Sequence, residues 1–228
     1  MRDLGSFRHH QVFLNYPFDA DFSTIAEALN FAVVAAGLLP VCALDLSAPD
    51  RPRLDMLIDA ISCCHYSVHD LSRAKGDGHE NFARMNMPIE MGLALYPALT
   101  SQRAEHRCAF FVASPHDYKR FASDLAGLDP RCHNEDPATA VTLMYEWLRA
   151  VVPATIFNSC PTVEVVTCFD DYQRTATRVK GSGINGHPSH VELREVMYGV
   201  CEERGWWDWR KAKVGQTAFP KLPLSWKP

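Results

Sequence analysis

Short apolar segments alternate with amphipathic segments along the first two thirds of the chain, and this alternation limits the fold more than any other feature. Four segments rich in strand-forming residues are predicted as β-strands, at residues 10–16, 38–44, 65–71 and 107–113. They are almost continuously apolar, as strands are when both faces of their sheet are covered.

Helical patterns follow each predicted strand. They lie at residues 22–36, at residues 54–61, in the segment that carries Glu90, and in the segment that begins at Pro137 behind Asp136. Strands that alternate with helices form a parallel sheet covered on both faces. We therefore predict a doubly wound α/β domain at residues 8–152, with a mostly parallel sheet of about five strands.

The last third of the chain has a different pattern. Residues 160–181 and 187–215 each look helical, with a glycine-containing loop at 181–190 between them. Three tryptophans lie close together in the sequence GWWDWR, which is more than an exposed tail would hold. We predict that residues 153–228 form a C-terminal helical extension that packs on the α/β domain or on a partner.

Composition and charge exclude several classes of function. The net charge is −4 and the basic residues are scattered, so we expect no nucleic acid partner. The first 30 residues do not read as a signal peptide, and no segment has the roughly 18 apolar residues that a membrane helix needs, so we expect no membrane partner and a cytoplasmic location.

The cysteines and histidines indicate no metal site. The chain has eight cysteines and ten histidines but no C-x-x-C motif, which predicts neither zinc nor a disulfide framework and fits a reducing compartment. His9, His10, His187 and His190 lack convincing partner ligands in the sequence. Nucleotide-binding motifs of the dinucleotide and P-loop types are also absent.

The predicted topology places a ligand crevice at one edge of the sheet. In the flavodoxin-like strand order 2-1-3-4-5, the crevice lies beyond the carboxyl ends of the first and third strands. Its walls would be the segment 15–18 after the first strand and the segment 69–73 after the third. On topology alone, Asp70, Ser72, Arg73 and Glu90 should converge there.

Glu90 is the most informative single residue. It lies about one turn into a helix, where the helix dipole favours an anion, and its neighbours Met87, Ile89 and Met91 would keep it partly dry. Such a carboxylate could stabilise or capture a sugar cation. The alternative is an ordinary surface carboxylate near the start of a helix.

The other candidates also have plainer interpretations. Asp70 could simply cap the turn after its strand. Arg73 and Arg84 could bind phosphate, or could be solvated loop residues. His69 is expected to be a core histidine on the opposite sheet face from Asp70. Residues 121–136, which include Asp124, Asp129 and His133, could close over the crevice or form a surface loop.

Three segments resemble a known superfamily. The sequences VFLNYPFD at 12–19, SVHDLSR at 67–73 and NMPIEMGLALYPA at 86–98 look like the nucleoside 2-deoxyribosyltransferase-like and TIR-like superfamily. In that group an apolar strand ends in an aspartate, and a loop leads to a helix that carries E-x-G-x-A. The resemblance covers roughly residues 10–113 and is closest to bacterial TIR-like proteins.

The resemblance implies cleavage of the bond between a base and a ribose. We expect an N-glycosidase that acts on a nucleotide, with NAD⁺ as the leading substrate, no cofactor, and a role in antiphage defence. It also implies a homo-oligomer. The matched residues would be Glu90 and Asp70 as catalytic groups, with substrate-binding residues Asn15, Tyr16, Pro17, Phe18, Ser72, Arg73, Arg84 and Asn86.

Two alternatives remain open beside NAD⁺ hydrolysis. One is another nucleoside or nucleotide N-glycosidase, or a deoxyribosyltransferase. The segment RMNMPIE lacks the aspartates that usually precede the glutamate in transferases, with Asn86 as the only polar side chain near it, which disfavours the transferase. The other alternative is a non-catalytic TIR-like module that senses nucleotides or self-assembles.

Overall fold

A computed structural model describes seven stretches of the chain: residues 10–46, 50–73, 86–100, 105–120, 122–125, 127–182 and 188–208. They form a five-stranded, all-parallel sheet with strand order β2-β1-β3-β4-β5. The strands are β1 (Gln11–Asn15), β2 (Leu39–Cys42), β3 (Tyr66–Asp70), β4 (Arg107–Val112) and β5 (Arg131–Cys132). The predicted doubly wound fold and strand order are confirmed.

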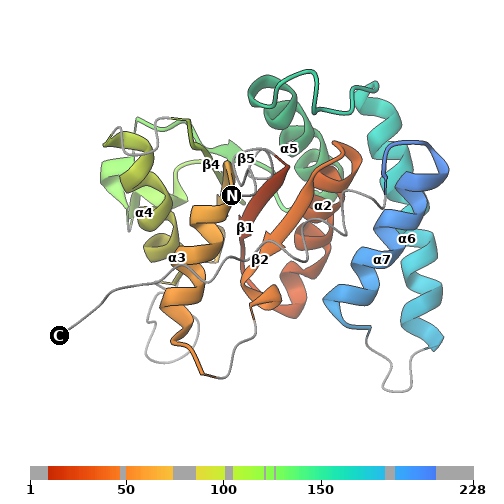
Figure 1. Ribbon diagram of the computed structural model, residues 1–228, viewed down its shortest axis with the longest axis horizontal. Coiled ribbons are helices and arrows are strands. Elements are labelled where there is room, and N and C mark those ends of the chain that lie inside the picture. Colours follow the sequence, from red (N-terminus) through yellow and green to blue (C-terminus); the bar gives the residue numbers. More distant parts are fainter. Residues whose placement is uncertain are drawn as a thin grey trace, which may run out of the picture.

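Helices cover both faces of the sheet (Figure 1). One face carries α3 (Arg53–Cys63) and α4 (Asn86–Leu99), and the other carries α2 (Ser23–Ala35) and α5 (Pro137–Val151). Outside α2 lie α6 (Thr162–Ser182) and α7 (His190–Glu203), which add a further layer. Short 3-10 helices occur at η1 (Ala20–Phe22), η2 (Ala43–Asp45), η3 (Asp117–Arg120) and η4 (Ser123–Leu125).

Helix α2 lies at the centre of the molecule rather than on its surface. Every residue from 27 to 35 is buried, because the sheet covers one side of the helix and α6 and α7 cover the other. Phe31 of α2 packs against Phe169 and Tyr172 of α6, with ring centroids 5.3 and 5.6 Å apart. The C-terminal helices therefore share one hydrophobic core with the α/β layers.

The end of the described chain is also packed. Trp207 is 4 % exposed and stacks on Tyr198 of α7 with ring centroids 4.5 Å apart. Trp207 thus packs within the C-terminal helices, while Trp209 lies outside the described residues. The described helices include none with the length and apolarity needed to cross a bilayer.

The sheet has the predicted fifth strand, but the position of β5 in the sequence was not predicted. It falls in the segment 121–136, which the sequence pattern assigned to a loop. The strand has only two residues, both half-buried, and Arg131 begins it, so it lacks the apolar run that marks the other four strands. It pairs with β4 through Phe111 and Val112.

Candidate functional site

The carboxyl ends of β1 and β3 are tied to the first turn of α4. Asn15, at the end of β1, is 5 % exposed, and its side-chain amide donates hydrogen bonds to Met87 O at 2.9 Å and to His69 Nδ1 at 3.0 Å. His69 is fully buried; burial, with a smaller effect of His106, lowers its pKa to about 3. The ring is therefore neutral at physiological pH, with its proton on Nε2. His69 is a core histidine, as predicted.

Glu90 is a buried acid on this same face of the sheet. It is the fifth residue of α4 and is 9 % exposed. Its Oε2 has no hydrogen-bond partner among the described residues. Burial raises the pKa of this carboxyl to about 7, although the positive charge of Arg53 opposes the shift. A carboxyl group in this state can exchange its proton near neutral pH.

Asp70 faces the other side of the sheet. Side chains alternate along a strand, and Tyr66 and Val68 of β3 belong to the core formed with α2 and α5, so Asp70 points the same way. Asp70 is fully buried, and its Oδ1 accepts a hydrogen bond from the Ser72 backbone N–H at 2.9 Å. Its Oδ2 accepts one from His133 Nε2 at 3.0 Å.

Ser72, His133 and Asp70 resemble a catalytic triad in composition but not in geometry. The backbone N–H of Glu135 donates to His133 Nδ1 at 3.1 Å, so the ring carries its proton on Nε2. That same Nε2 faces both Asp70 at 3.0 Å and Ser72 Oγ at 3.1 Å. A triad requires the acid and the nucleophile on opposite ring nitrogens. The three residues therefore hold the loop after β3 in place rather than activate the serine.

The turn after β5 completes this network under backbone strain. Asn134 and Glu135 have φ angles of 54° and 56°, and Asp136 N donates to His133 O at 2.8 Å, which makes a type I′ turn. Non-glycine residues adopt such angles at a cost. Glu135 also forms an ion pair with Arg73 at 3.3 Å. Thus β5 clamps the Asp70 loop at two points.

The predicted site is therefore brought together only in part. Asp70, Ser72 and Arg73 lie in one network, as expected. The described contacts do not join Glu90 to them, because the two-residue period of β3 directs Asp70 away from α4. Asn86 is exposed at the start of α4, and Arg84 lies outside the described residues. His133, foreseen only as part of a loop that could close over the crevice, is the residue that holds Asp70.

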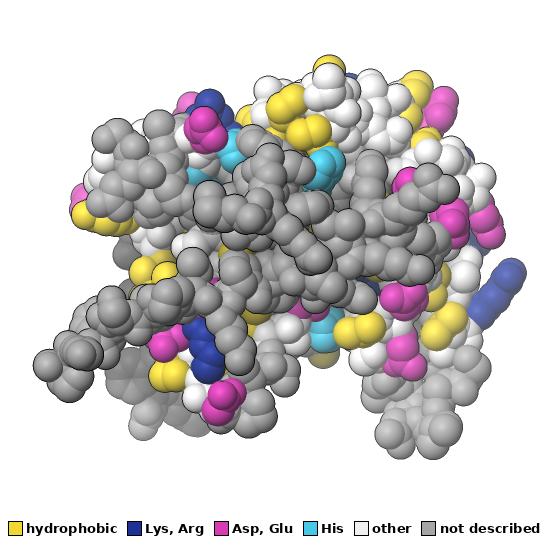
Figure 2. Space-filling view, in the orientation of Figure 1, with side chains coloured by type: hydrophobic (Ala, Val, Ile, Leu, Met, Phe, Trp, Pro, Cys, Tyr) yellow, Lys and Arg dark blue, Asp and Glu magenta, His cyan; other side chains and the backbone are white. Residues whose placement is uncertain are grey.

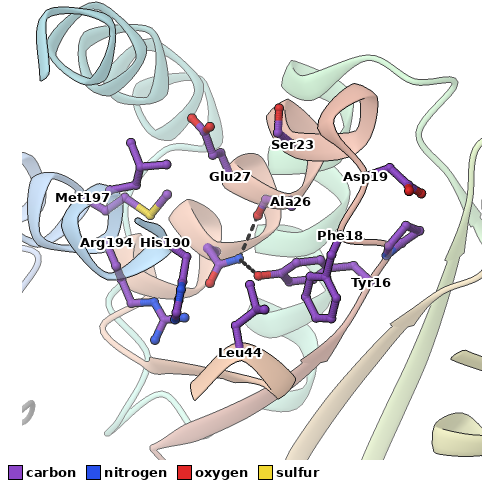
Figure 3. A pocket seen from close by; sticks show the side chains of 13 residues that line it. Tyr16, Phe18, Asp19, Ser23, Ala26, Glu27, Leu44, His190, Arg194 and Met197 are labelled. Atoms are coloured by element: carbon purple, nitrogen blue, oxygen red, sulfur yellow. Dashed lines mark hydrogen bonds between the residues drawn. The ribbon is translucent and has the colours of Figure 1, made fainter. Parts of the chain in front are cut away.

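Tyr16, Pro17 and Phe18 line a cavity of about 160 Å³ beside α2 and α7 (Figure 3). Helix α7 contributes four lining residues. Leu44 of η2 also lines the cavity and lies at the bottom of the view in Figure 3. Asp70 and Glu90 are not among the lining residues. The sequence pattern missed this site because nothing in residues 187–215 shows which helix face would meet β1.

A charged cluster locks α7 to the end of β2. Both carboxylate oxygens of Asp45 pair with Arg194, at 3.0 and 3.2 Å, and His190 Nε2 lies 3.1 Å from Oδ1. Burial raises the pKa of Asp45, but the hydrogen bond from His190 and the charge of Arg194 outweigh it and lower the pKa to about 2. The sequence did not show this partner of His190, because Asp45 is 145 residues away along the chain.

The same cluster has the composition of a metal site. Potential ligand atoms of Cys42, Asp45 and His190 lie within 4.8 Å of one another. However, the Arg194 guanidinium occupies both Asp45 oxygens and lies 3.6 Å from Cys42 Sγ. A bound cation would have to displace this guanidinium, so the cluster fits an ion-pair lock better than a metal site.

The fold and these groups define a doubly wound parallel α/β protein with buried ionisable side chains at the carboxyl edge of its sheet. Figure 2 shows acidic side chains spread over the described surface on one face of the molecule, without a continuous basic patch among them. Comparison of the chain with protein-family models and with curated protein sequences gives no match.

Proposed function

We propose that the chain is an N-glycosidase that cleaves the base–ribose bond of a nucleotide, with NAD⁺ as the leading substrate and Glu90 as the catalytic carboxylate. One observation carries the proposal. Glu90 lies near the carboxyl edge of the sheet, and its buried carboxyl has an oxygen without a described partner and a pKa raised to about 7. A structural carboxylate would have hydrogen-bond donors around it, as Asp70 has.

The chemistry needs a carboxylate and little else. Breaking the bond between C1′ of the ribose and the nicotinamide nitrogen leaves an oxocarbenium-like sugar, and the bonding electrons go to the nicotinamide, which leaves neutral. Ionised Glu90 would stabilise the sugar cation, and water would add to C1′ and release a proton. The reaction should therefore accelerate as the pH rises through about 7, where Glu90 loses its proton.

The remaining predicted residues take supporting roles in this proposal. Asn15 fixes the first turn of α4 through Met87 O and so positions the helix that carries Glu90. Asp70 and Ser72 shape the neighbouring loop. Arg73 could meet a phosphate only by leaving Glu135, an exchange that the exposed ion pair permits at little cost.

The test is turnover by wild type and by Glu90→Gln, with Glu164→Gln as the matched control. Glu164 is an exposed glutamate on α6, so its replacement makes the same chemical change away from the proposed site. Each protein is incubated with NAD⁺, NADP⁺ and a panel of nucleosides and nucleotides, and free base is measured by chromatography. We expect release by wild type and Glu164→Gln, and a loss of about 100-fold or more in Glu90→Gln. Equal turnover by Glu90→Gln would refute the assignment.

A second candidate is a non-catalytic, self-assembling module, and a specific feature favours it. Helix α4 exposes Ile89, Tyr96 and Leu99, with exposed fractions of 53 %, 61 % and 73 %. Their spacing places them along one stripe of the helix. Such a stripe suits contact with a second copy of the chain. Concentration-dependent association in sedimentation, together with no base release from any substrate, would favour this function.

A further inference from the structure

We propose that the cavity between β1, α2 and α7 binds a single-ring heteroaromatic molecule that carries an N–H donor, at a site separate from Glu90. The cavity has a volume of about 160 Å³. A cavity of about 150 Å³ in another protein accepts benzene, so one ring is enough to fill this space.

The walls are suited to a flat apolar body. Tyr16 and Phe18 meet edge to face, with ring centroids 5.4 Å apart, and present aromatic surface to the cavity. Pro17 lines it from the segment after β1, Leu44 from η2, and Leu193 and Met197 from α7. Aromatic rings pack well against such edges and against methionine sulfur.

One buried polar atom supplies the selectivity. Asn30 lines the cavity and is 5 % exposed. Its side-chain N–H groups are occupied, because they donate to Tyr16 Oη at 3.0 Å and to Ala26 O at 2.8 Å. Its Oδ1 has no hydrogen-bond partner in the part of the chain that the structure describes. A buried acceptor without a donor is costly, so a ligand N–H that reaches it would be favoured.

The charges near the cavity do not favour a phosphate. Arg194 and His190 line it, but both are engaged by Asp45. Glu27 also lines it; its Oε2 accepts a hydrogen bond from Tyr172 Oη at 2.9 Å, and Figure 3 shows the side chain directed away from Leu44. The ligand is therefore better described as an uncharged ring with an amide or amino group than as a nucleotide.

The cavity exists only because the C-terminal extension is docked. His190, Leu193, Arg194 and Met197 follow one face of α7, and the ion pairs with Asp45 hold α7 against η2 at the end of β2. Since Glu90 is not among the lining residues, binding here does not depend on the proposed catalytic role.

The experiment measures binding of nicotinamide and of cytosine to the full chain by calorimetry and by ligand-observed NMR. Methyl nicotinate serves as the comparison, because it keeps the ring and loses the N–H donors. We expect saturable binding of at least one of the two donor-bearing rings, and binding of methyl nicotinate weaker by about tenfold if nicotinamide is the ring that binds, the loss of one hydrogen bond.

Two variants locate the site. Ala26→Leu places extra bulk in the cavity, whereas Thr24→Leu makes a comparable change at an exposed position of the same helix. We expect Ala26→Leu to weaken binding at least about tenfold, and Thr24→Leu and Glu90→Gln to bind as wild type does. If Ala26→Leu does not fold, Leu44→Trp replaces it, because Leu44 is 42 % exposed and can be enlarged without disturbing the core.

Three results would overturn the proposal. The first is the absence of saturable binding by both donor-bearing rings. The second is undiminished binding in the folded cavity-filling variant. The third is loss of binding in Glu90→Gln alone, which would place the ring beside Glu90. Base release is measured in a separate assay, so the failure of this proposal and the failure of the proposed N-glycosidase can be told apart.

Discussion

Two carboxyl groups close to the sheet's carboxyl edge show that burial alone does not determine what an acid does. Asp70 is more deeply buried than Glu90, yet it has donors from Ser72 and His133. Glu90 keeps an oxygen without a described donor, and its pKa rises to about 7. The hydrogen-bond donors around a carboxyl group, and not only its buried fraction, therefore distinguish Asp70 from Glu90.

The raised pKa of Glu90 predicts how the free energy of unfolding changes with pH. Its pKa is about 7 in the folded chain, against an ordinary value of 4.5. Between these values the folded protein binds more protons than the unfolded chain, so this residue lowers stability as the pH rises through that window. We expect Glu90→Gln to gain stability relative to wild type from pH 5 to pH 8, by at most about 3 kcal/mol.

Urea denaturation of both proteins at several pH values measures this difference. Other titrating groups are shared and cancel in the comparison. Glu164→Gln should follow wild type at every pH, because that glutamate is exposed. A stability difference between wild type and Glu90→Gln that is constant from pH 5 to pH 8 would contradict the raised pKa.

At the scale of elements, the shortest strand has the most consequence for the site. Strand β5 delivers His133 to Asp70 and Glu135 to Arg73, across the end of β4. Two residues of strand and a strained turn therefore position the loop after β3. Strain of this kind persists where surrounding contacts fix it, as the Asp70–His133 pair does here.

A double-mutant cycle tests this clamp. His133→Ala removes a donor from the fully buried Asp70 and should cost about 3–5 kcal/mol. Asp70→Asn alone should also destabilise. The double variant should lose less than the sum of the two, since neither group is then left without its partner. Additive losses, measured by chemical denaturation, would show that the two side chains are not coupled.

The elements that the sequence predicted are those whose own residues determine them. Strands such as residues 11–15 are buried and mostly apolar, and α5 begins at Pro137 behind Asp136, whose side chain accepts from Thr139 N at 2.8 Å. Strand β5 could not be found this way, because only pairing with β4 defines it. For the same reason, the sequence predicted that Asp70, Ser72 and Arg73 lie together but not which residues they contact. Topology places residues at an edge, but the partners of Asp70 and of His190 come from distant segments.

At the scale of the whole molecule, α2 makes the α/β layers and the C-terminal helices one unit. Its residues contact the sheet and also α6 and α7. Glu27 accepts from Tyr172 Oη at 2.9 Å, and Phe31 packs on Phe169. The described residues therefore should unfold together rather than in two steps.

The variant Phe169→Ala tests whether the α/β layers and the C-terminal helices unfold together. Phe169 is 1 % exposed, and its loss should lower the free energy of unfolding by about 3–5 kcal/mol. We expect one transition, shifted as a whole, by both far-ultraviolet circular dichroism and tryptophan fluorescence. Val163→Ala on the same helix, at a side chain 71 % exposed, should change stability by less than about 0.5 kcal/mol. Two separate transitions, of which only one moves, would contradict a shared core.

The central position of α2 also has a consequence for the order of events during synthesis. The helix ends at Ala35, but α7, which helps to cover it, begins only at His190, about 150 residues later. At about 5–20 residues per second, a ribosome needs roughly 10–30 s to make that stretch. Throughout this interval the nascent chain carries a largely apolar helix with one side not fully covered. Until α7 emerges, the uncovered side of α2 is apolar surface of the kind that promotes aggregation of nascent chains.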